Sequence, residues 1–550
     1  MRFKALILAL VALLAAAPSA AAQPAPVAQE VTVNFLTRGE PESLDPARAS
    51  VASAVDGAVA RQVFEPLLRF DENLVPQPAA ASSYEVSSDG TTYTFHLRPD
   101  GRWSDGQPVT AGQFEFAWKR MLDPATHAEY APLFVDAGIA GANVYNSGKD
   151  PTPEHVGVNA VNDLTLQIQL SQPFGALPDL AALSAGAPLR PDLVNADPDG
   201  WATEPATYIG NGPFMVSEWV HADHLTLVPN PQYVAHFGWP RPTLARATIL
   251  MHTDPEQDFA SYTSANSPDW VEVPDDDANQ VLNDQALAAQ SRQYTEMSTF
   301  WVQMNNAHPP LDNVLVRRAL SRAVDRAALV RDLAAGLSIP STSIIPPGMP
   351  GFQDGVGQDL AFDPTAARAL LSQAGFGEAQ PLPSLTFNFP DTPAEHHRAE
   401  YLQAQWHTNL GIDVQLNPLD GDTYQQALAS GDYDLVFGGW SADYPDPQDW
   451  LGKVFDCAST FNTFKYCNSS FDQVAARADL SANLADRLQL YAQAQTQLLQ
   501  DAPVAPLFVR GRLALVKPWV QSTDGGPLIV TPLDEYPGSL FLDKVQVLPH

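Results

Sequence analysis

Between residues 385 and 437, three short apolar runs alternate with two segments of helical periodicity. The runs 385–389, 412–416 and 433–437 have the length and composition of buried strands, and 394–409 and 423–429 read as the helices between them. Strands that alternate with helices in this way form consecutive βαβ units and a parallel sheet. This part of the chain therefore predicts an α/β fold, in which ligands gather at the carboxyl ends of the strands.

A glycine- and aromatic-rich segment, Gly-Gly-Trp-Ser-Ala-Asp-Tyr-Pro-Asp-Pro at 438–447, follows the last of these strands. The two glycines are expected to end the strand where another group approaches the backbone closely, and the prolines to keep the exit extended. Asp443 between Trp440 and Tyr444 could cradle a cation with an apolar body. The alternative, which spacing alone favours, is a surface loop with Trp440 in the core.

The first 22 residues have the pattern of a cleavable secretory signal. Arg2 and Lys4 precede an uncharged run at 5–17, and the segment ends in Ala-Ala-Ala22. No cysteine precedes Cys457, so there is no thiol for lipid attachment. We therefore expect cleavage after Ala22 and a periplasmic protein without a lipid anchor.

Charge and cysteine content narrow the possible partners. The formal net charge of −33 argues against nucleic acid and anionic lipid surfaces. The two cysteines, Cys457 and Cys467, lie ten residues apart, and in an oxidising compartment they are expected to form a disulfide. Two thiols with no histidine between them make a poor zinc site.

Signatures of catalysis and of cofactor binding are missing from the sequence. It contains no Gly-x-Ser-x-Gly, His-Glu-x-x-His, P-loop or Gly-x-Gly-x-x-Gly motif. His396 and His397 are adjacent on a predicted helix and therefore point about 100° apart, which disfavours joint metal binding. We expect no cofactor, no metal and no enzymatic activity, although an acid pair of the glycosidase type has no sequence signature that would exclude it.

Several motifs together identify a family resemblance. The segment 439–447 resembles the Gly-Trp-x-x-Asp-Tyr-x-x-Pro signature of the oligopeptide- and dipeptide-binding proteins of ABC importers (bacterial extracellular solute-binding protein family 5, cluster C). Residues 95–110 are similar to its Phe-x-Leu-Arg…Trp-Ser-Asp-Gly-x-Pro-Val-Thr element. Other matches occur in the family's order at 43–46, 209–214, 230–233 and 515–519.

The resemblance implies a two-lobed periplasmic binding protein of type II, with an additional small α+β subdomain and the ligand in the interlobe cleft. Such proteins close on the ligand by a hinge. The expected division of the chain is 1–22 signal peptide, 23–62 first part of lobe I, 63–185 extra subdomain, 186–296 second part of lobe I, 297–505 lobe II and 506–550 return to lobe I.

The resemblance also implies roles for particular residues. Asp443 would pair with the α-ammonium of an extended peptide, beside Gly439 and Trp440. A loop at Ser50, Val51, Ala52 and Ser53 would add the peptide as a strand, with a register made uncertain by an insertion before Val63. Further expected ligand-side residues are Tyr130 and Trp301 as pocket walls, and His397 with Arg398 at the position where dipeptide-type relatives hold the ligand carboxylate.

One departure concerns cysteines. Some family members join a cysteine beside the signature tryptophan to one before the central strand, and here Ser441 and Ser298 occupy these positions.

The sequence therefore predicts a monomeric periplasmic receptor that delivers oligopeptides to an inner-membrane ABC permease complex. Three alternatives stay open. The same fold could bind a non-peptide solute such as an oligosaccharide, a nickel chelate or an opine. The chain could be a secreted hydrolase, or it could have a chaperone-like role.

Overall fold

The structure is a computed structural model that describes residues 30–550 apart from 35–38, 42, 50–53, 253, 265–266, 334–335, 432, 527–529 and 532–538. The expected signal peptide and the predicted ligand loop at Ser50, Val51, Ala52 and Ser53 lie outside the described residues. Among the helices that are described, none combines the length and the apolar character needed to cross a bilayer.

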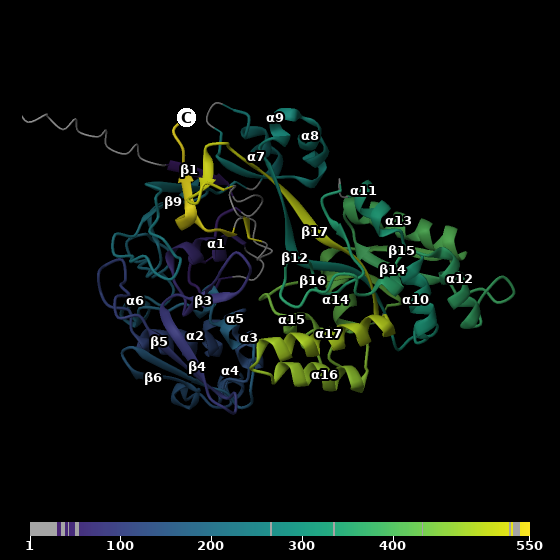
Figure 1. The fold of residues 1–550 in the computed structure, drawn as a ribbon, viewed down its shortest axis with the longest axis horizontal. Helices are drawn as coiled ribbons and strands as arrows, with labels where there is room; N and C mark the ends of the chain where they lie inside the picture. The colour runs from purple at the N-terminus through teal and green to yellow at the C-terminus, as the bar shows by residue number, and fades with distance from the viewer. Residues whose placement is uncertain are drawn as a thin grey trace, which may run out of the picture.

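One large mixed sheet runs through both halves of the molecule (Figure 1). In the described residues it has eleven strands, and β13 (Ile339–Pro340) adds to β17 at one side. The strand order is β15 (Val414–Leu419), β14 (Leu385–Pro390), β16 (Leu435–Ser441), β12 (Ser291–Met304), β17 (Val504–Val516), β11 (Trp270–Val273), β1 (Glu30–Asn34), β10 (Arg246–Leu250), β9 (His224–Pro229) and β8 (Phe214–Val220).

Two long strands, β12 and β17, connect the halves. The first residues of β12 pair with Gly511–Leu515 of β17, whereas residues 298–304 pair with β16 on one side and with the start of β17 on the other. The register of β12 against β17 shifts between Thr295 and Thr299, so the ladder is interrupted near its middle. The two strands thus pass from one half of the sheet to the other through an irregular stretch.

The βαβ pattern predicted for residues 385–437 is present in lobe II. β14, β15 and β16 are parallel neighbours, and α13 (Pro393–Leu410) and α14 (Gly421–Ser430) connect them. The side chains of Thr392 and Asp420 cap the N-termini of these helices. Each helix ends at a glycine in the left-handed region, Gly411 and Gly431, so local signals and the fold agree here.

The sequence pattern predicts one long helix over residues 313–335, but the structure has two helices there. α10 (Val314–Arg322) ends at Ala323, and α11 (Arg326–Leu333) begins three residues later. The side chain of Asp325 accepts a hydrogen bond from the Ala328 amide, which starts the second helix. The buried Arg326 donates to the carbonyl oxygens of residues 321, 324, 360 and 506, which fixes the break to the rest of the lobe.

A separate antiparallel sheet forms the core of the extra subdomain, in the order β4 (Ala81–Val86), β5 (Thr92–Leu97), β7 (Thr165–Gln169) and β6 (Val158–Asn162). The family signature at 95–110 leads from β5 into α2 (Ala111–Leu122). Its Trp103 is fully buried and donates to Gln113, which is also part of the capping box at the start of α2. The signature therefore has a structural role.

The remaining helices surround these sheets. They are α1 (Ala54–Val63), α3 (Ala131–Asp136), α4 (Ala142–Asn146), α5 (Leu177–Leu180), α6 (Pro191–Ala196), α7 (Pro255–Ser261), α8 (Ala278–Asn283), α9 (Gln285–Ala288), α12 (Pro364–Gln373), α15 (Gln448–Leu451), α16 (Ser469–Asp479) and α17 (Leu484–Asp501).

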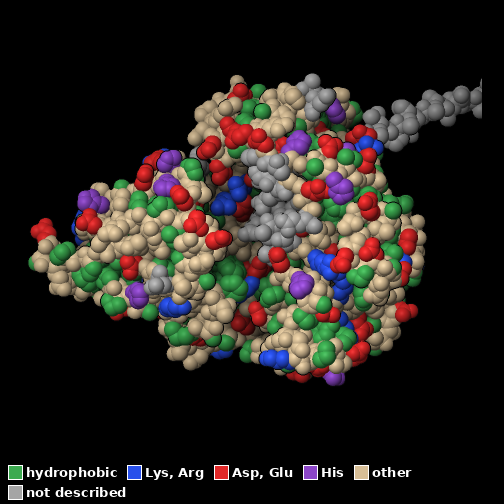
Figure 2. Space-filling view, turned by 180° about the vertical axis from the view of Figure 1, so that it is seen from behind, with side chains coloured by type: hydrophobic (Ala, Val, Ile, Leu, Met, Phe, Trp, Pro, Cys, Tyr) green, Lys and Arg blue, Asp and Glu red, His purple; other side chains and the backbone are tan. Residues whose placement is uncertain are grey.

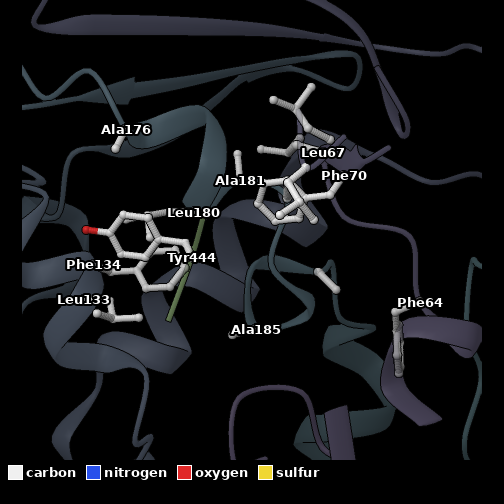
Figure 3. Packing of buried hydrophobic residues seen from close by; sticks show 14 of the residues in the cluster. Phe64, Leu67, Phe70, Leu133, Phe134, Ala176, Leu180, Ala181, Ala185 and Tyr444 are labelled. Atoms are coloured by element: carbon white, nitrogen blue, oxygen red, sulfur yellow. The ribbon is translucent and has the colours of Figure 1, made fainter. Parts of the chain in front are cut away.

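The helices α15–α17 lie against the extra subdomain and share one hydrophobic cluster with it (Figure 1). Tyr444, the residue after Asp443, is almost fully buried and lies beside Phe134 and Leu180 of the subdomain (Figure 3). The buried Arg487 of α17 contacts Asp446 at 2.6 Å and Asp179 of the subdomain at 4.0 Å. The segment that carries Asp443 is thus held from two sides.

A pH-sensitive carboxyl group lies in this contact region. Burial raises the pKa of Asp479 to about 7, although a hydrogen bond from Tyr491 opposes the shift. A carboxyl with a raised pKa in the folded state favours folding when protonated, so its stabilising contribution is lost as the pH rises from about 4 through 7. We expect Asp479→Asn to raise the free energy of unfolding by about 1–3 kcal/mol at pH 8 and to have little effect near pH 4. Urea denaturation at both pH values measures this, and a pH-independent difference would contradict it.

Candidate ligand-binding site

A cavity of about 580 Å³ opens between the lobes. Seen from the side opposite to Figure 1, the molecule is hollowed between its two halves, and acidic side chains are spread over both (Figure 2). The lining is mainly aromatic and small apolar residues, with charged side chains at a few points. It consists of Ala49, Gly57, Arg61, Pro66, Arg69, Phe70, Tyr130, Ala182, Leu183, Ser184, Ala185, Phe300, Pro390, Glu395, Tyr424, Phe437, Gly438, Gly439, Trp440, Ser441, Ala442, Asp443, Arg510 and Phe541.

The signature segment enters the cavity as the end of β16. The expectation that Gly438 and Gly439 end the strand is wrong, because β16 continues through them to Ser441 and stays paired with β12. The expected close approach is present, since a Cβ atom at Gly438 would lie 2.6 Å from the Gln303 side chain and one at Gly439 would lie 2.8 Å from the Phe300 ring. The glycines allow the strand to pass large side chains of β12.

The pairing of β12 with β16 brings together the two serines that the resemblance places at the family's cysteine positions. Ser298 of β12 and Ser441 of β16 are direct partners in the ladder. They occupy facing positions, where two cysteines could pair.

Asp443 belongs to a compact cluster of two carboxylates and one lysine. Its carboxylate pairs with Lys453, and Lys453 lies 3.6 Å from Asp449. Asp449 is fully buried, and its Oδ2 accepts hydrogen bonds from the indole of Trp440 at 3.0 Å and from the amide of Asp443 at 2.8 Å. Asp449 therefore fixes both signature residues, while the side chain of Asp443 is 25% exposed at the cavity.

The charges in this cluster are tightly coupled. Burial and the neighbouring Asp443 raise the pKa of Asp449 well above its ordinary value, and Lys453 opposes this. Burial alone would lower the pKa of Lys453, but Asp449 and Asp443 raise it above its ordinary value. The lysine is consequently a permanent cation between two acids, and with both acids ionised the cluster has a net charge of −1.

Lys453 also fills the aromatic cradle that the sequence suggested for a cation. Its ammonium lies 5.1 Å from the centre of the Trp440 ring and 5.2 Å from that of Phe461. Phe461 meets Trp440 edge to face at 5.0 Å. The cradle is thus formed by Trp440 and Phe461, whereas Tyr444 points into the subdomain core (Figure 3).

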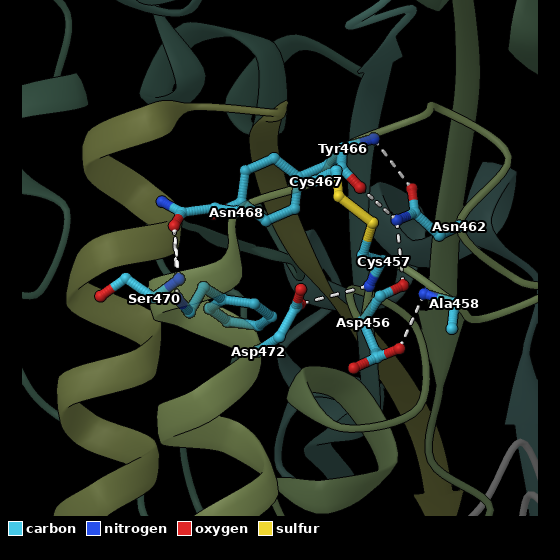
Figure 4. Close-up of a disulfide and its surroundings, with 10 residues drawn as sticks. Asp456, Cys457, Ala458, Asn462, Tyr466, Cys467, Asn468, Ser470 and Asp472 are labelled. Atoms are coloured by element: carbon cyan, nitrogen blue, oxygen red, sulfur yellow. Dashed lines mark hydrogen bonds between the residues drawn. A yellow bond between two sulfur atoms is a disulfide. The ribbon is translucent and has the colours of Figure 1, made fainter.

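Phe461 is presented by the loop that the disulfide closes (Figure 4). The predicted bond between Cys457 and Cys467 is present, so neither sulfur is available to a metal together with Asp472. Inside the loop, Asn462 donates to the carbonyl oxygens of Asp456 and Tyr466 at 3.0 and 2.6 Å. The disulfide and Asn462 together hold the loop against the cavity wall.

Removing the disulfide should lower the stability of the protein. We expect Cys457→Ser with Cys467→Ser to lower the free energy of unfolding by about 2–3 kcal/mol, the loop-closure value for a ring of this size. Guanidinium denaturation of the double variant measures the loss, with the oxidised and the reduced wild-type protein as references. An unchanged unfolding midpoint in both the variant and the reduced protein would contradict this.

The structure brings some of the predicted site residues together and leaves others apart. Gly439, Trp440, Asp443 and Tyr130 line the cavity. Trp301 is fully buried behind the wall, 5.7 Å from Phe455 ring to ring, and is not among the lining residues.

The two candidates on α13 also lie outside the lining. Arg398 pairs with Glu395, which does line the cavity. Its guanidinium lies over Phe437 at 4.7 Å. His397 precedes it and is exposed.

Sequence reasoning missed Lys453, Phe461 and Arg510. Asp449 and Lys453 are four residues apart, a spacing that places two side chains on one face of a helix, so a coupled pair could have been suspected. For Arg510, which reaches the cavity from β17, no local signal distinguishes it from a surface arginine.

Comparison with known proteins agrees with this architecture. The family model of the bacterial extracellular solute-binding proteins, family 5 (middle region), matches residues 75–462. The chain is 31% identical to the periplasmic oligopeptide-binding protein OppA of Salmonella typhimurium over 98% of this chain and 97% of that protein. It is 30% identical to the probable deoxycholate-binding periplasmic protein YgiS of Escherichia coli, over 93% and 94%.

The fold and the match define a two-lobed solute-binding protein of periplasmic type II. The chain belongs to the bacterial extracellular solute-binding proteins, family 5. It is accordingly an extracellular or periplasmic protein.

The structure is more similar to the unliganded open form of one relative than to the peptide complex of another. The structure has a TM-score of 0.83 to the unliganded open form of the murein tripeptide-binding protein MppA, at 28% identity and 95% and 98% coverage. The score is 0.69 to Haemophilus influenzae OppA in complex with RPPGFSPFR, at 27% identity and 95% and 99% coverage. Since identity and coverage are alike, we attribute the difference in TM-score to the relative placement of the lobes.

Proposed function

We propose that the protein is a monomeric periplasmic receptor that captures oligopeptides in an extended conformation and delivers them to an inner-membrane ABC permease. In this proposal, residues 1–22 direct export, and the lobes close along the boundaries predicted from the sequence. The observation that carries the proposal is the cluster around Asp443, an acidic group held at the wall of an interlobe cavity.

The cluster suits one additional cation. Asp443 and Asp449 share a single lysine, so an incoming ammonium would complete the pairing of charges. Asp443 is the partly exposed member, and closure of the lobes would remove it from water together with the ligand. A buried charge without a partner is costly, which makes the ammonium a required feature of the ligand.

The backbone next to the cluster offers a place for an extended chain. β14 pairs with β16 at Leu435 and Val436 only, while β16 continues to Ser441 along the cavity. Residues 438–441 therefore present a strand edge on the side away from β12, beyond Phe437, whose carbonyl accepts a hydrogen bond from Tyr424. An N-terminal ligand residue that adds to this edge satisfies its own amide and carbonyl groups without its side chain being read, while the following residues cross the cavity.

Two measurements test the proposal. Native mass spectrometry of the protein as purified should reveal co-purifying peptides. Calorimetry of the protein, stripped of ligand by unfolding and refolding, should then show binding of alanine peptides of two to five residues. A stripped, refolded protein that binds none of them would refute peptide capture.

A second candidate is an anionic amphipathic solute. One relative is named for deoxycholate, the cavity lining is largely apolar, and Arg510 adds a cation to it. Such a solute has no ammonium and would not need Asp443. Tight binding of deoxycholate, unaffected by Asp443→Asn, would favour this candidate over peptide capture.

A further inference from the structure

Three phenylalanine rings form a stacked platform on the lobe II side of the cavity. Phe300 of β12 stacks on Phe437 of β16 with 5.8 Å between ring centres, and on Phe508 of β17 with 5.2 Å. Phe300 and Phe437 line the cavity. The three rings form a continuous aromatic cluster across three neighbouring strands, next to Gly439 and Trp440.

Two arginines lie on this platform. Arg398 lies over Phe437 and Phe508, at 4.7 and 5.2 Å, and is neutralised by Glu395. Arg510 lies over Phe300 at 4.4 Å and lines the cavity. Stacking holds a guanidinium in one plane and leaves its edge free for hydrogen bonds.

Arg510 lacks a full partner. Its nearest acid is Glu296, whose Oε2 lies 3.7 Å from Nη1, while Oε1 of the same carboxylate is bound by Arg512 at 2.7 Å. Within the described part of the chain, Arg510 donates no hydrogen bond, and 34% of its side chain is exposed. Burial lowers the pKa of Arg510; Glu296 and Asp275 oppose this shift, and the neighbouring Arg512 and Arg398 add to it.

The other charged groups lining the cavity are already engaged. Arg69 pairs with Asp543 at 3.2 Å and stacks on Trp239 at 4.1 Å. Arg61 also has an interaction partner. The two acids, Glu395 and Asp443, each have a cation beside them. Among the described lining residues, Arg510 is therefore the cation best placed to receive an anion.

We propose that Arg510 is the receptor for the carboxylate of the ligand. For peptides this rests on the proposed function, with the ammonium at Asp443 and the C-terminal carboxylate on the guanidinium of Arg510.

The sheet register places the strand segments that precede Asp443 and Arg510 on opposite sides of β12. Trp440 pairs with Thr299, and Thr299 pairs with Val509, the residue before Arg510. Two strand spacings, about 10 Å, separate the backbones of Trp440 and Val509, which is about the length of three extended residues.

The test is calorimetry with trialanine and with its C-terminal amide. Both are titrated into wild-type protein, Arg510→Gln, Arg510→Lys and the control Arg331→Gln, which changes an exposed arginine of lobe II. We expect amidation to weaken binding to the wild type roughly 10- to 100-fold, and Arg510→Gln to weaken binding of the free acid by a similar factor. On Arg510→Gln, amidation should have little further effect. Arg510→Lys should restore part of the loss, because the charge returns without the planar fork.

The outcomes separate this inference from the proposed function. If trialanine binds but its amidation penalty is the same in wild type and Arg510→Gln, the carboxylate does not meet Arg510 and the inference fails alone. If no alanine peptide of two to five residues binds while deoxycholate binds and loses affinity in Arg510→Gln, peptide capture fails and the role of Arg510 stands. If wild-type protein binds neither an alanine peptide nor deoxycholate, both are contradicted. Circular dichroism of each variant checks that a loss of binding is not a loss of folding.

Discussion

Replacing Asp443 by Asn is expected to weaken peptide binding by roughly 100-fold or more. The variant keeps the size of the side chain and removes its charge. In the variant, Lys453 would pair with the buried Asp449 alone. No unpaired carboxylate would remain in the cluster for the ligand ammonium. The affinity loss therefore combines a missing ion pair with repulsion from Lys453.

Calorimetry with alanine peptides measures the loss. Asp359→Asn, which neutralises a half-exposed acid in the same lobe, is the matched control and should bind like wild type. The thermal stability of Asp443→Asn should stay close to that of wild type, because the side chain lies at the cavity rather than in the core. Equal peptide affinity in Asp443→Asn and wild type would remove Asp443 from the site.

Replacing Trp301 by Ala is expected to reduce the free energy of unfolding by about 3–5 kcal/mol. The ring is fully buried behind the cavity wall and packs against Phe455, so its removal leaves a void that the neighbouring strands cannot fill. Trp440→Ala should cost less stability, since Trp440 is only half-buried. Its effect should instead be on ligand affinity, through the loss of the hydrogen bond to Asp449 and of the contact with Lys453.

Denaturant unfolding and calorimetry on both variants separate these roles. Trp301→Ala is expected to lose mainly folding stability. Trp440→Ala is expected to lose mainly ligand affinity, with a smaller loss of folding stability. The reverse pattern would mean that Trp301 reaches the ligand, as the family resemblance implied.

Local signals made the lobe II fold predictable. Strand and helix periodicities at 385–437 are reinforced by caps at Thr392 and Asp420 and by terminal glycines, so each segment is specified by its own residues. The two incorrect predictions of secondary structure concern segments whose conformation depends on tertiary contacts. The continuation of β16 depends on its pairing with β12, and the break at Asp325 depends on Arg326 bonding to carbonyl groups far along the chain.

The part of the site that lies in the family signature was predictable from the sequence. Asp443, Trp440 and Gly439 lie in one signature, and the structure places all three at the cavity. The cation that fills the cradle could not be foreseen, because Lys453 reaches Asp443 only through the turn made by α15. Arg510 becomes part of the site only through the register of β17 against β12.

The most direct test of the central claim, that Asp443 receives the ammonium of the ligand, is a cycle of N-acetylation and mutation followed by calorimetry. Trialanine and N-acetyl-trialanine are titrated into wild-type protein and Asp443→Asn. Acetylation is expected to weaken binding to wild type roughly 100-fold and to have little further effect on Asp443→Asn. If acetylation carries the same penalty in both proteins, the ammonium is recognised elsewhere and the account is contradicted.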